Sequence, residues 1–196
     1  MPERLVEFRY GPAPAAVVLL VVLLAGSGCS AAAPERVDAP STPPVLRAPS
    51  PSPPDPVSAA RQAALAAYAG MWAAYDEAGR APQADPDHPA LAQFATRDAL
   101  EGLRTGLGRL RERGLVFEGG YALTAPEVVD LDPPDAPTRA EVEDCLDSRD
   151  WVVVRADGGE YDDEPGGRRA VFADIELGED GVWRVTGFAL RAVGTC

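Results

Sequence analysis

The chain after residue 57 carries apolar residues at helical spacing as far as about residue 113. A first stripe recurs every three or four positions, at Leu65, Tyr68, Trp72 and Tyr75. This spacing predicts an amphipathic helix that begins at an N-capping Ser58 and ends near Gly79. A polar loop broken by prolines follows over residues 80–89, and a short helix is expected over residues 89–95.

The next helical stripe is stricter than the first. Its members fall three or four residues apart, at Leu100, Leu103, Leu107 and Leu110. Thr96 is the expected N-cap. Gly114 is the expected stop, because glycine readily takes the left-handed conformation that ends many helices. Three glycines inside the segment each weaken it by about 1 kcal/mol relative to alanine, at Gly102, Gly106 and Gly108.

Beyond Gly114 the apolar period changes to two, which is typical of strands. Turn signals rich in Gly, Pro and Asp separate the segments. The expected strands cover residues 115–123, 127–131, 138–146, 151–156, 169–177 and 182–192. Alternation is clearest in two sets, each expected to share one face: Val171, Ala173, Ile175 and Leu177, and Trp183, Val185, Gly187 and Ala189.

Helices that come first and strands that follow predict a segregated α+β domain rather than an alternating α/β one. We expect residues 58–196 to form this domain, with the helices over about 58–113 and the strands over about 115–193. Consecutive hairpins should form a curved antiparallel meander, with the helices packed on one of its faces.

The N-terminal segment has the pattern of an export signal. An apolar run over residues 15–25 follows Arg4 and Arg9. At 1.5 Å per residue it reaches roughly 16 Å, about half of a bilayer core, so it is too short to span one and fits the apolar region of a signal peptide. The small residues before Cys29 resemble the lipobox of bacterial lipoproteins, although Gly26 stands where Leu is usual.

That resemblance implies a lipoprotein signal over residues 1–28 and acylation of Cys29. Acyl chains on one cysteine would supply the two hydrophobic signals that stable anchoring needs. The protein would then lie outside the cytoplasm, tethered to the outer face of the cell membrane. The alternative is an ordinary signal peptide cleaved nearby, with Cys29 left as a chance residue.

Residues 29–57 form the expected tether between the anchor and the domain. Nine of the 28 residues over 30–57 are proline, and none is aromatic. Such a stretch favours extended polyproline II, with a reach of about 90 Å at 3.1 Å per residue. A Pro-rich ligand for a partner domain is the alternative interpretation.

Charge and composition exclude several classes of protein. The net charge is −13 and the pI about 4.4, which argues against a nucleic-acid partner and against electrostatic docking on anionic lipid. One His and three Cys are too few for a zinc site with four cysteines or with two cysteines and two histidines. All 18 basic residues are Arg, with no Lys or Asn, which indicates a high-GC genome.

The three helices and the curved sheet resemble the nuclear transport factor 2-like fold, the α+β cone also seen in ketosteroid isomerases and polyketide cyclases. Several stretches resemble a group of secreted lipoproteins of high-GC Gram-positive bacteria that has no assigned activity. They are residues 67–72 (AYAGMW), 142–147 (VEDCLD), 165–169 (PGGRR), 181–185 (GVWRV) and 193–196 (VGTC).

With Cys29 acylated, Cys145 and Cys196 remain, and an even pair in an exported protein predicts a disulfide. Two free thiols are one alternative. A zinc site that uses all three cysteines and His88 is another, but only if Cys29 is not acylated, and no two of these residues have ligand spacing. We expect no metal and no cofactor, because no phosphate-binding loop, dinucleotide fingerprint or nucleophile elbow occurs.

The resemblance to cone-fold isomerases implies a pocket carboxylate as base and a Tyr or protonated acid as donor. The weak candidates are Asp144, Asp147, Tyr75 and Tyr121, with Tyr68 as a further tyrosine that could face a cavity. Asp144 and Asp147 are three positions apart, so only one of them can face a pocket. The simpler interpretation makes Glu141, Glu143, Asp144 and Asp147 a solvated acidic edge, and the Tyr and Trp residues at helical spacing part of the core.

Two further motifs have ordinary explanations. His88 lies in a loop broken by prolines, where an exposed, idle side chain is expected rather than a metal ligand or base. The acidic run over residues 161–164 lacks the alternating ligands of a calcium loop and predicts a solvated hairpin tip.

Two functions therefore compete. The first is a non-catalytic accessory domain that binds a small ligand or a cell-envelope partner, and the second is a cone-fold enzyme of the isomerase or cyclase type. The enzyme requires a deep apolar pocket with a buried carboxylate, such as an inward Asp144 or Asp147 beside a tyrosine. The accessory domain requires a shallow pocket or one filled by aromatic side chains. Residues 130–164 hold 13 acidic residues against three Arg, so this region is either a solvated surface or a site for a basic partner.

Overall fold

The computed structural model describes residues 55–80, 82–164 and 166–196, all within one compact unit that runs from Ser50 to Cys196. The expected signal segment over 1–28, Cys29 and the tether as far as residue 54 lie outside the described residues. Among the described residues, no helix combines the length and the apolar composition that crossing a bilayer requires.

The first helix, α1 (Pro56–Arg80), begins slightly earlier than the sequence suggested. Asp55 is the residue that caps it: one of its carboxylate oxygens accepts hydrogen bonds from the Ser58 amide and hydroxyl, both at 2.9 Å. Pro56 suits the first helical position, because an N–H at this position would have no acceptor within the helix. The prediction of Ser58 as the N-cap is therefore wrong, because Ser58 is the donor in this cap and not the acceptor.

Two further helices follow, α2 (Leu91–Phe94) and α3 (Arg97–Glu112). Thr96 is the N-cap of α3, as predicted, but its side chain makes no capping bond. Gly114 has a φ of +66°, which confirms its predicted role in ending the helix. The buried face of α3 consists of Ala99, Leu103 and Leu107.

The strands form two sheets. Their bounds are β1 (Leu115–Gly119), β2 (Ala122–Leu123), β3 (Glu127–Asp132), β4 (Arg139–Asp147), β5 (Trp151–Arg155), β6 (Arg168–Leu177) and β7 (Trp183–Leu190). The larger sheet has the order β2-β4-β6-β7, with β3 also paired to β4, and the smaller sheet pairs β1 with β5. All these pairs are antiparallel.

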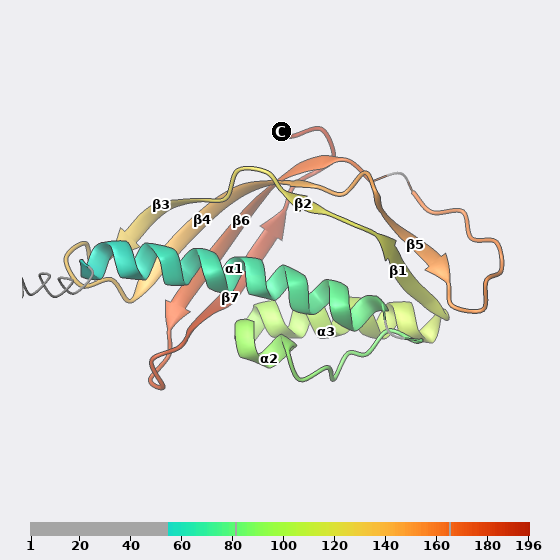
Figure 1. Cartoon of the computed structure of the whole chain (residues 1–196), viewed down its shortest axis with the longest axis horizontal. Coiled ribbons are helices and arrows are strands. Elements are labelled where there is room, and N and C mark those ends of the chain that lie inside the picture. The colour runs from blue at the N-terminus through green and yellow to red at the C-terminus, as the bar shows by residue number, and fades with distance from the viewer. Residues whose placement is uncertain (1–54, 81, 165) are drawn as a thin grey trace, which may run out of the picture. The chain divides into compact units, whose positions relative to one another are not determined.

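The strand order corrects the expected meander. Only β3–β4 and β6–β7 pair as consecutive hairpins, whereas β4 pairs with β6 and skips β5. The chain turns at residues 148–150, so β5 leaves the larger sheet and pairs with β1 in the opposite arm (Figure 1). The segregated α+β class is confirmed, with α1 lying across one face of the larger sheet (Figure 1).

An extra residue in β7 changes which of its side chains face the helices. Ile175 pairs with Val185 but Asp174 pairs with Gly187, so Thr186 is unpaired in a bulge. Val185 and Phe188 therefore pack toward the core, while Gly187 lies opposite Asp174 on the other face. The prediction that Val185, Gly187 and Ala189 share a face is wrong for this reason.

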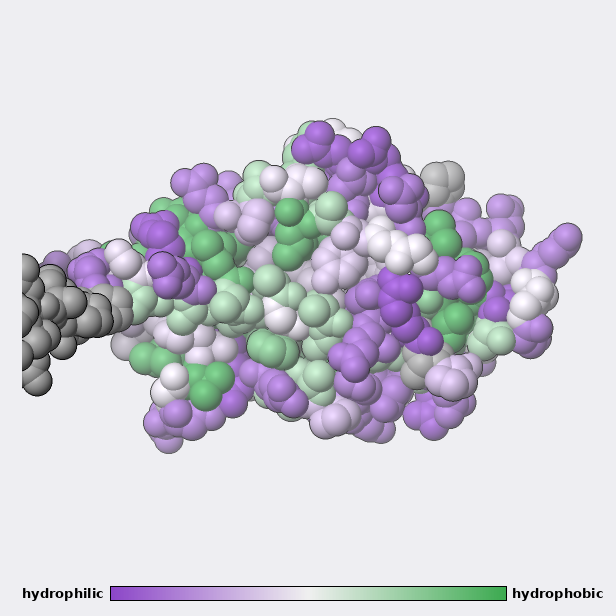
Figure 2. Space-filling view, viewed as in Figure 1, coloured by the Kyte–Doolittle hydropathy of each residue, from purple (hydrophilic) through white to green (hydrophobic). Residues whose placement is uncertain are grey.

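The core lies between α1 and the larger sheet. Its largest fully buried side chains include Tyr68 and Met71 from α1, Leu103 and Leu107 from α3, and Ile175 from β6. The outward side of α1 is rich in alanine, and Figure 2 shows weakly hydrophobic residues along this helix with hydrophilic ones around them. The open face of the sheet, opposite α1, carries the alternate side chains of β3, β4 and β6.

Candidate functional site

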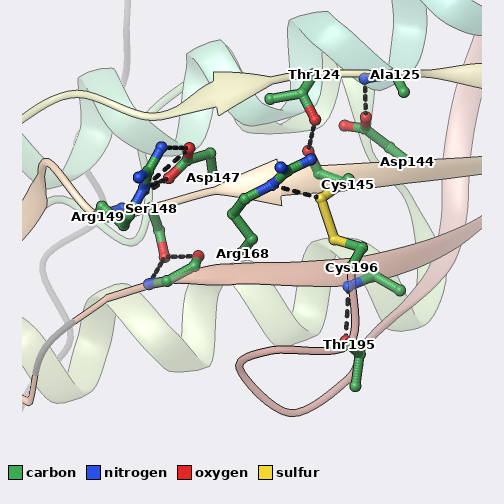
Figure 3. The surroundings of a disulfide bond; sticks show 12 residues. Thr124, Ala125, Asp144, Cys145, Asp147, Ser148, Arg149, Arg168, Thr195 and Cys196 are labelled. Atoms are coloured by element: carbon green, nitrogen blue, oxygen red, sulfur yellow. Dashed lines mark hydrogen bonds and ion pairs between the residues drawn. A yellow bond between two sulfur atoms is a disulfide. The ribbon is translucent and has the colours of Figure 1, made fainter.

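Asp144 is buried on the helix-facing side of β4, with 6% of its surface exposed. Its Oδ2 accepts a hydrogen bond from the Tyr68 hydroxyl at 3.1 Å. Its Oδ1 accepts one from the Ala125 amide at 2.9 Å (Figure 3). The expectation that Asp144 belongs to a solvated acidic edge is wrong. Alternation along β4 turns it inward together with Val142 and Leu146.

The tyrosine partner is held in its neutral form. Burial raises the pKa of Tyr68 far above its ordinary value, and the negative charge of Asp144 raises it further. Tyr68 therefore remains a donor to the Asp144 carboxylate at physiological pH. With both carboxylate oxygens bonded to protein donors, the pair ties α1 to β4 and to the segment before β3.

The space between α1 and the sheet is filled by aromatic rings around Trp72. Its ring centroid lies 5.8–6.4 Å from those of Tyr68, Tyr75, Tyr121, Trp151 and Phe188. These separations are typical of packed aromatic pairs. We call these six residues the aromatic cluster.

Tyr75 and Tyr121, two of the predicted pocket residues, are thus packed against the core. Burial raises the pKa of Tyr75 to about 12, and burial together with the nearby Asp76 raises that of Tyr121 to about 12. The interpretation of the Tyr and Trp residues at helical spacing as core is confirmed. Within the cluster, the indole N–H groups of Trp72 and Trp151 are buried and have no acceptor among the described residues.

One depression opens at the edge of the aromatic cluster. Its lining includes Phe117, Trp151, Val153 and Arg169, together with Asp163, Glu164 and Gly166. Neither Asp144 nor Tyr68 lines this depression or the four other pockets described for the domain. The buried Asp144 carboxylate therefore does not reach any of these five pockets.

Asp147, the other candidate carboxylate, lies at the end of β4 on the face away from α1, opposite Arg168. The guanidinium of Arg149 pairs with it at 2.5 Å, and the backbone amide of Arg149 donates a further bond. These hydrogen bonds lower the pKa of Asp147 to about 2. The prediction that Asp144 and Asp147 point to opposite faces of the strand is confirmed.

Cys145 and Cys196 lie within bonding distance, with their Sγ atoms 2.08 Å apart (Figure 3). Cys145 is on β4, and Cys196 ends a tail that runs beside the start of β6. The Gly194 amide donates to the Arg168 carbonyl at 2.7 Å, and the Thr195 hydroxyl accepts from the Ala170 amide at 2.9 Å.

His88 is half-buried at the loop before α2. Its Nε2 lies 3.9 Å from a Glu77 carboxylate oxygen, and its Nδ1 has no hydrogen-bond partner among the described residues. Over residues 55–80, 82–164 and 166–196, no group of three or more His, Cys, Asp or Glu side chains is arranged to hold a metal ion.

A feature that sequence reasoning missed is a groove on the open face of the larger sheet. Two depressions meet there and share Glu141 and Asp174 as lining residues. The first also contains Val129, Glu143 and Phe172. Strand alternation indicates that these residues point away from a core, but only the pairing of β3, β4 and β6 brings them together.

Comparison of the sequence finds no match among protein-family models and none among curated proteins. Comparison of the fold finds solved structures of low identity. The intermembrane space region of the chloroplast protein ARC6 is 18% identical, with a TM-score of 0.46 over 67% of this chain and 96% of that one.

Two bacterial structures are similar to a comparable extent. A ketosteroid isomerase-like protein from Erwinia carotovora atroseptica is 14% identical, with a TM-score of 0.43 over 65% of this chain and 91% of that one. A protein from Catenulispora acidiphila is 14% identical, with a TM-score of 0.40 over 68% of this chain and 91% of that one.

Proposed function

We propose that the domain is a non-catalytic binding module of an extracytoplasmic lipoprotein, tethered to the outer face of the cell membrane through acylated Cys29. The observation that carries the non-catalytic part is the aromatic cluster. Side chains packed around Trp72 occupy the space in which a cone-fold enzyme would enclose its substrate. A binding module can instead use its outer surfaces.

The pairing of Cys145 with Cys196 supports a location outside the cytoplasm, because disulfides persist mainly in oxidising compartments. The short apolar run over residues 15–25 and the small residues before Cys29 support the lipid anchor. The proline-rich tether would let the domain reach partners away from the bilayer surface.

A second candidate, a cone-fold enzyme, is favoured by one observation: Asp144 is buried beside Tyr68, as that function requires. The other requirement is an apolar pocket at the carboxylate. A general base must come within hydrogen-bond reach of its substrate's proton. Asp144 instead directs both oxygens at protein donors and lines none of the five pockets, so the binding module accounts better for the geometry.

The interior can be tested with indole and benzene as apolar probes. The Trp72 indole N–H has no acceptor among the residues that the structure describes, so its NMR resonance reports any molecule that enters the cluster. We expect no saturable shift of this resonance in the wild-type protein. The Phe188→Ala variant, which removes one neighbouring ring, is the control expected to admit the probes. A saturable shift in the wild type would show an open ligand site and favour the enzyme.

The anchor needs its own test in cells that export the full chain. Metabolic labelling with a fatty acid should mark the wild-type protein and should leave Cys29→Ala unlabelled. The variant should also move from the membrane fraction to the soluble fraction. An unlabelled wild type, or a labelled Cys29→Ala, would contradict the lipoprotein proposal.

A further inference from the structure

We propose that the groove on the open face of the larger sheet binds an extended, cationic segment of a partner polypeptide. This inference rests on the proposed binding function and names the surface and the partner chemistry. It follows from four observations: the exposure of this face, the alignment of its carboxylates, their lack of ion-pair partners, and the apolar side chains between them.

Like charges are aligned across three strands of this face. Asp130 on β3 and Asp174 on β6 each lie directly opposite Glu141 on β4. Glu127 lies directly opposite Glu143 in the same way. Directly opposed like charges destabilise a sheet, so this arrangement lowers the stability of the free domain. A cation bound between the carboxylates would remove that repulsion.

The five carboxylates form no ion pair with any residue of the described part of the chain. Three arginines at one end of this face are already paired with other acids. Arg139 pairs with Asp132, Arg97 with Glu176 at 2.7 Å, and Arg184 with Asp180 at 2.9 Å. This end of the face is thus neutralised from within the domain, while its centre is not.

Apolar side chains lie among the acids. Val129 and Phe172 are 47% and 37% exposed, and both line the groove. Arginine and lysine bury their aliphatic stems on apolar surface while their charged ends reach polar groups. A bare metal ion would gain nothing from Val129 or Phe172, so the mixture favours a polypeptide carrying these side chains.

The domain's own tail shows that this surface holds a guanidinium. The Arg191 guanidinium carbon lies 5.2 Å from the centroid of the Phe172 ring, within the range of a cation–π contact. Arg191 directly follows β7, and its amide donates to the Ala170 carbonyl at 2.9 Å. One cation therefore already lies beside the groove, and the proposed partner would supply others at Glu141 and Asp174.

The two depressions share Glu141 and Asp174, so together they form a groove that extends beyond the space that one bound side chain would occupy. An extended segment presents alternate side chains on one side at about 6.8 Å intervals, since each residue rises about 3.4 Å. Such a segment would place successive arginine or lysine side chains along the groove.

The test uses the full-length protein and a fluorescein-labelled, capped hexapeptide of alternating Arg and Val, with binding followed by anisotropy. Saturable binding that weakens with added salt is expected, because exposed ion pairs are screened. The double variant Glu141→Gln, Asp174→Asn should bind about tenfold more weakly, since two lost ion pairs together account for about 1.4 kcal/mol. Its melting temperature should not fall, because the change also removes repulsion within the sheet.

The matched control neutralises two exposed acids on α3, Glu101→Gln with Glu112→Gln, and changes the net charge equally. Equal loss of affinity in both double variants would overturn the proposal, since binding would then follow net charge alone. Absence of binding, or displacement of the peptide by spermine at equal concentration, would overturn it too. These outcomes test the groove alone. The proposed binding function is contradicted by a different result, a saturable shift of the Trp72 indole resonance in the wild-type protein.

Discussion

Asp144 and Asp147 come from the same strand and have opposite surroundings. Asp144 is buried between Tyr68 and the Ala125 amide, and Asp147 pairs with Arg149 on the other face. Their spacing alone predicts that they face different ways. It does not say which one is inward, because that depends on the pairing of β4 with β3 and β6, whose partners are distant in sequence.

Asp147 should titrate at an unusually low pH. Its folded pKa of about 2 lies below the ordinary value of 3.8, so its ion pair stabilises the fold above about pH 4. That contribution is lost as the pH falls from there through about 2. The Arg149→Gln variant should raise the pKa of Asp147 toward 3.8, measured by NMR titration of the carboxyl carbon.

The Arg155→Gln variant is the control for this titration. Arg155 lowers the pKa of Asp157 to about 2 in the same way, from a separate turn. It should therefore change Asp157 and leave Asp147 unaffected. An Asp147 pKa that stays near 2 without the Arg149 side chain would show that other groups depress it.

At the scale of elements, Gly79 in α1 and Gly102 in α3 have different surroundings. Gly79 in α1 faces Phe117, and a Cβ there would overlap the ring. Gly102 in α3 has open space around the position of a Cβ. Both glycines weaken a helix in the same way, so only the packing against the sheet distinguishes them.

We expect Gly79→Ala to lower the free energy of unfolding by about 1–3 kcal/mol, because the added methyl must displace a core ring. Gly102→Ala should raise it by about 0.5–1 kcal/mol through helix propensity. Urea denaturation of both variants measures the difference. A higher free energy of unfolding for Gly79→Ala would contradict this, because it would mean that the Phe117 ring moves aside without losing core contacts.

The elements themselves were largely predictable because their signals are local. The apolar stripe at Leu103 and Leu107 and the alternation at Val171 and Ile175 each depend on neighbouring residues only. The departure of β5 and the bulge at Thr186 were not predictable in this way. Both depend on which strand lies alongside, and hydrogen-bond partners far along the chain decide that.

At the scale of the whole molecule, the Cys145–Cys196 bridge should be a major source of stability. The two cysteines are 51 positions apart, and closing a loop of that length in the unfolded chain is worth about 4 kcal/mol on the chain-entropy model. The double variant Cys145→Ser, Cys196→Ser should have a free energy of unfolding lower by roughly that amount, measured by denaturant titration. Reductant should destabilise the wild type and leave the double variant unchanged.

The candidate sites were predictable to different degrees at this scale. The cysteine pair follows from counting cysteines in a chain whose N-terminal pattern predicts export, and the packed role of Tyr75 follows from aromatic residues at helical spacing. The packed role of Tyr121, which lies outside the helices, did not follow in this way. The groove around Glu141 and Asp174 did not follow, since its members come from separate strands. In the sequence, acidic residues at alternate positions are typical of any solvent-exposed strand face. Only the residues paired with them on neighbouring strands show that the carboxylates are aligned.

The position of α1 in the chain has a consequence for the order of assembly. The helix is alanine-rich and can form as soon as it emerges, but its aromatic face packs on β4, β6 and β7, which emerge later. During synthesis, the apolar surface around Trp72 therefore stays exposed until β4, β6 and β7 have been made. Until then this helix is the part of the domain most open to misassembly or aggregation, because it is the first element to form and among the last to be covered.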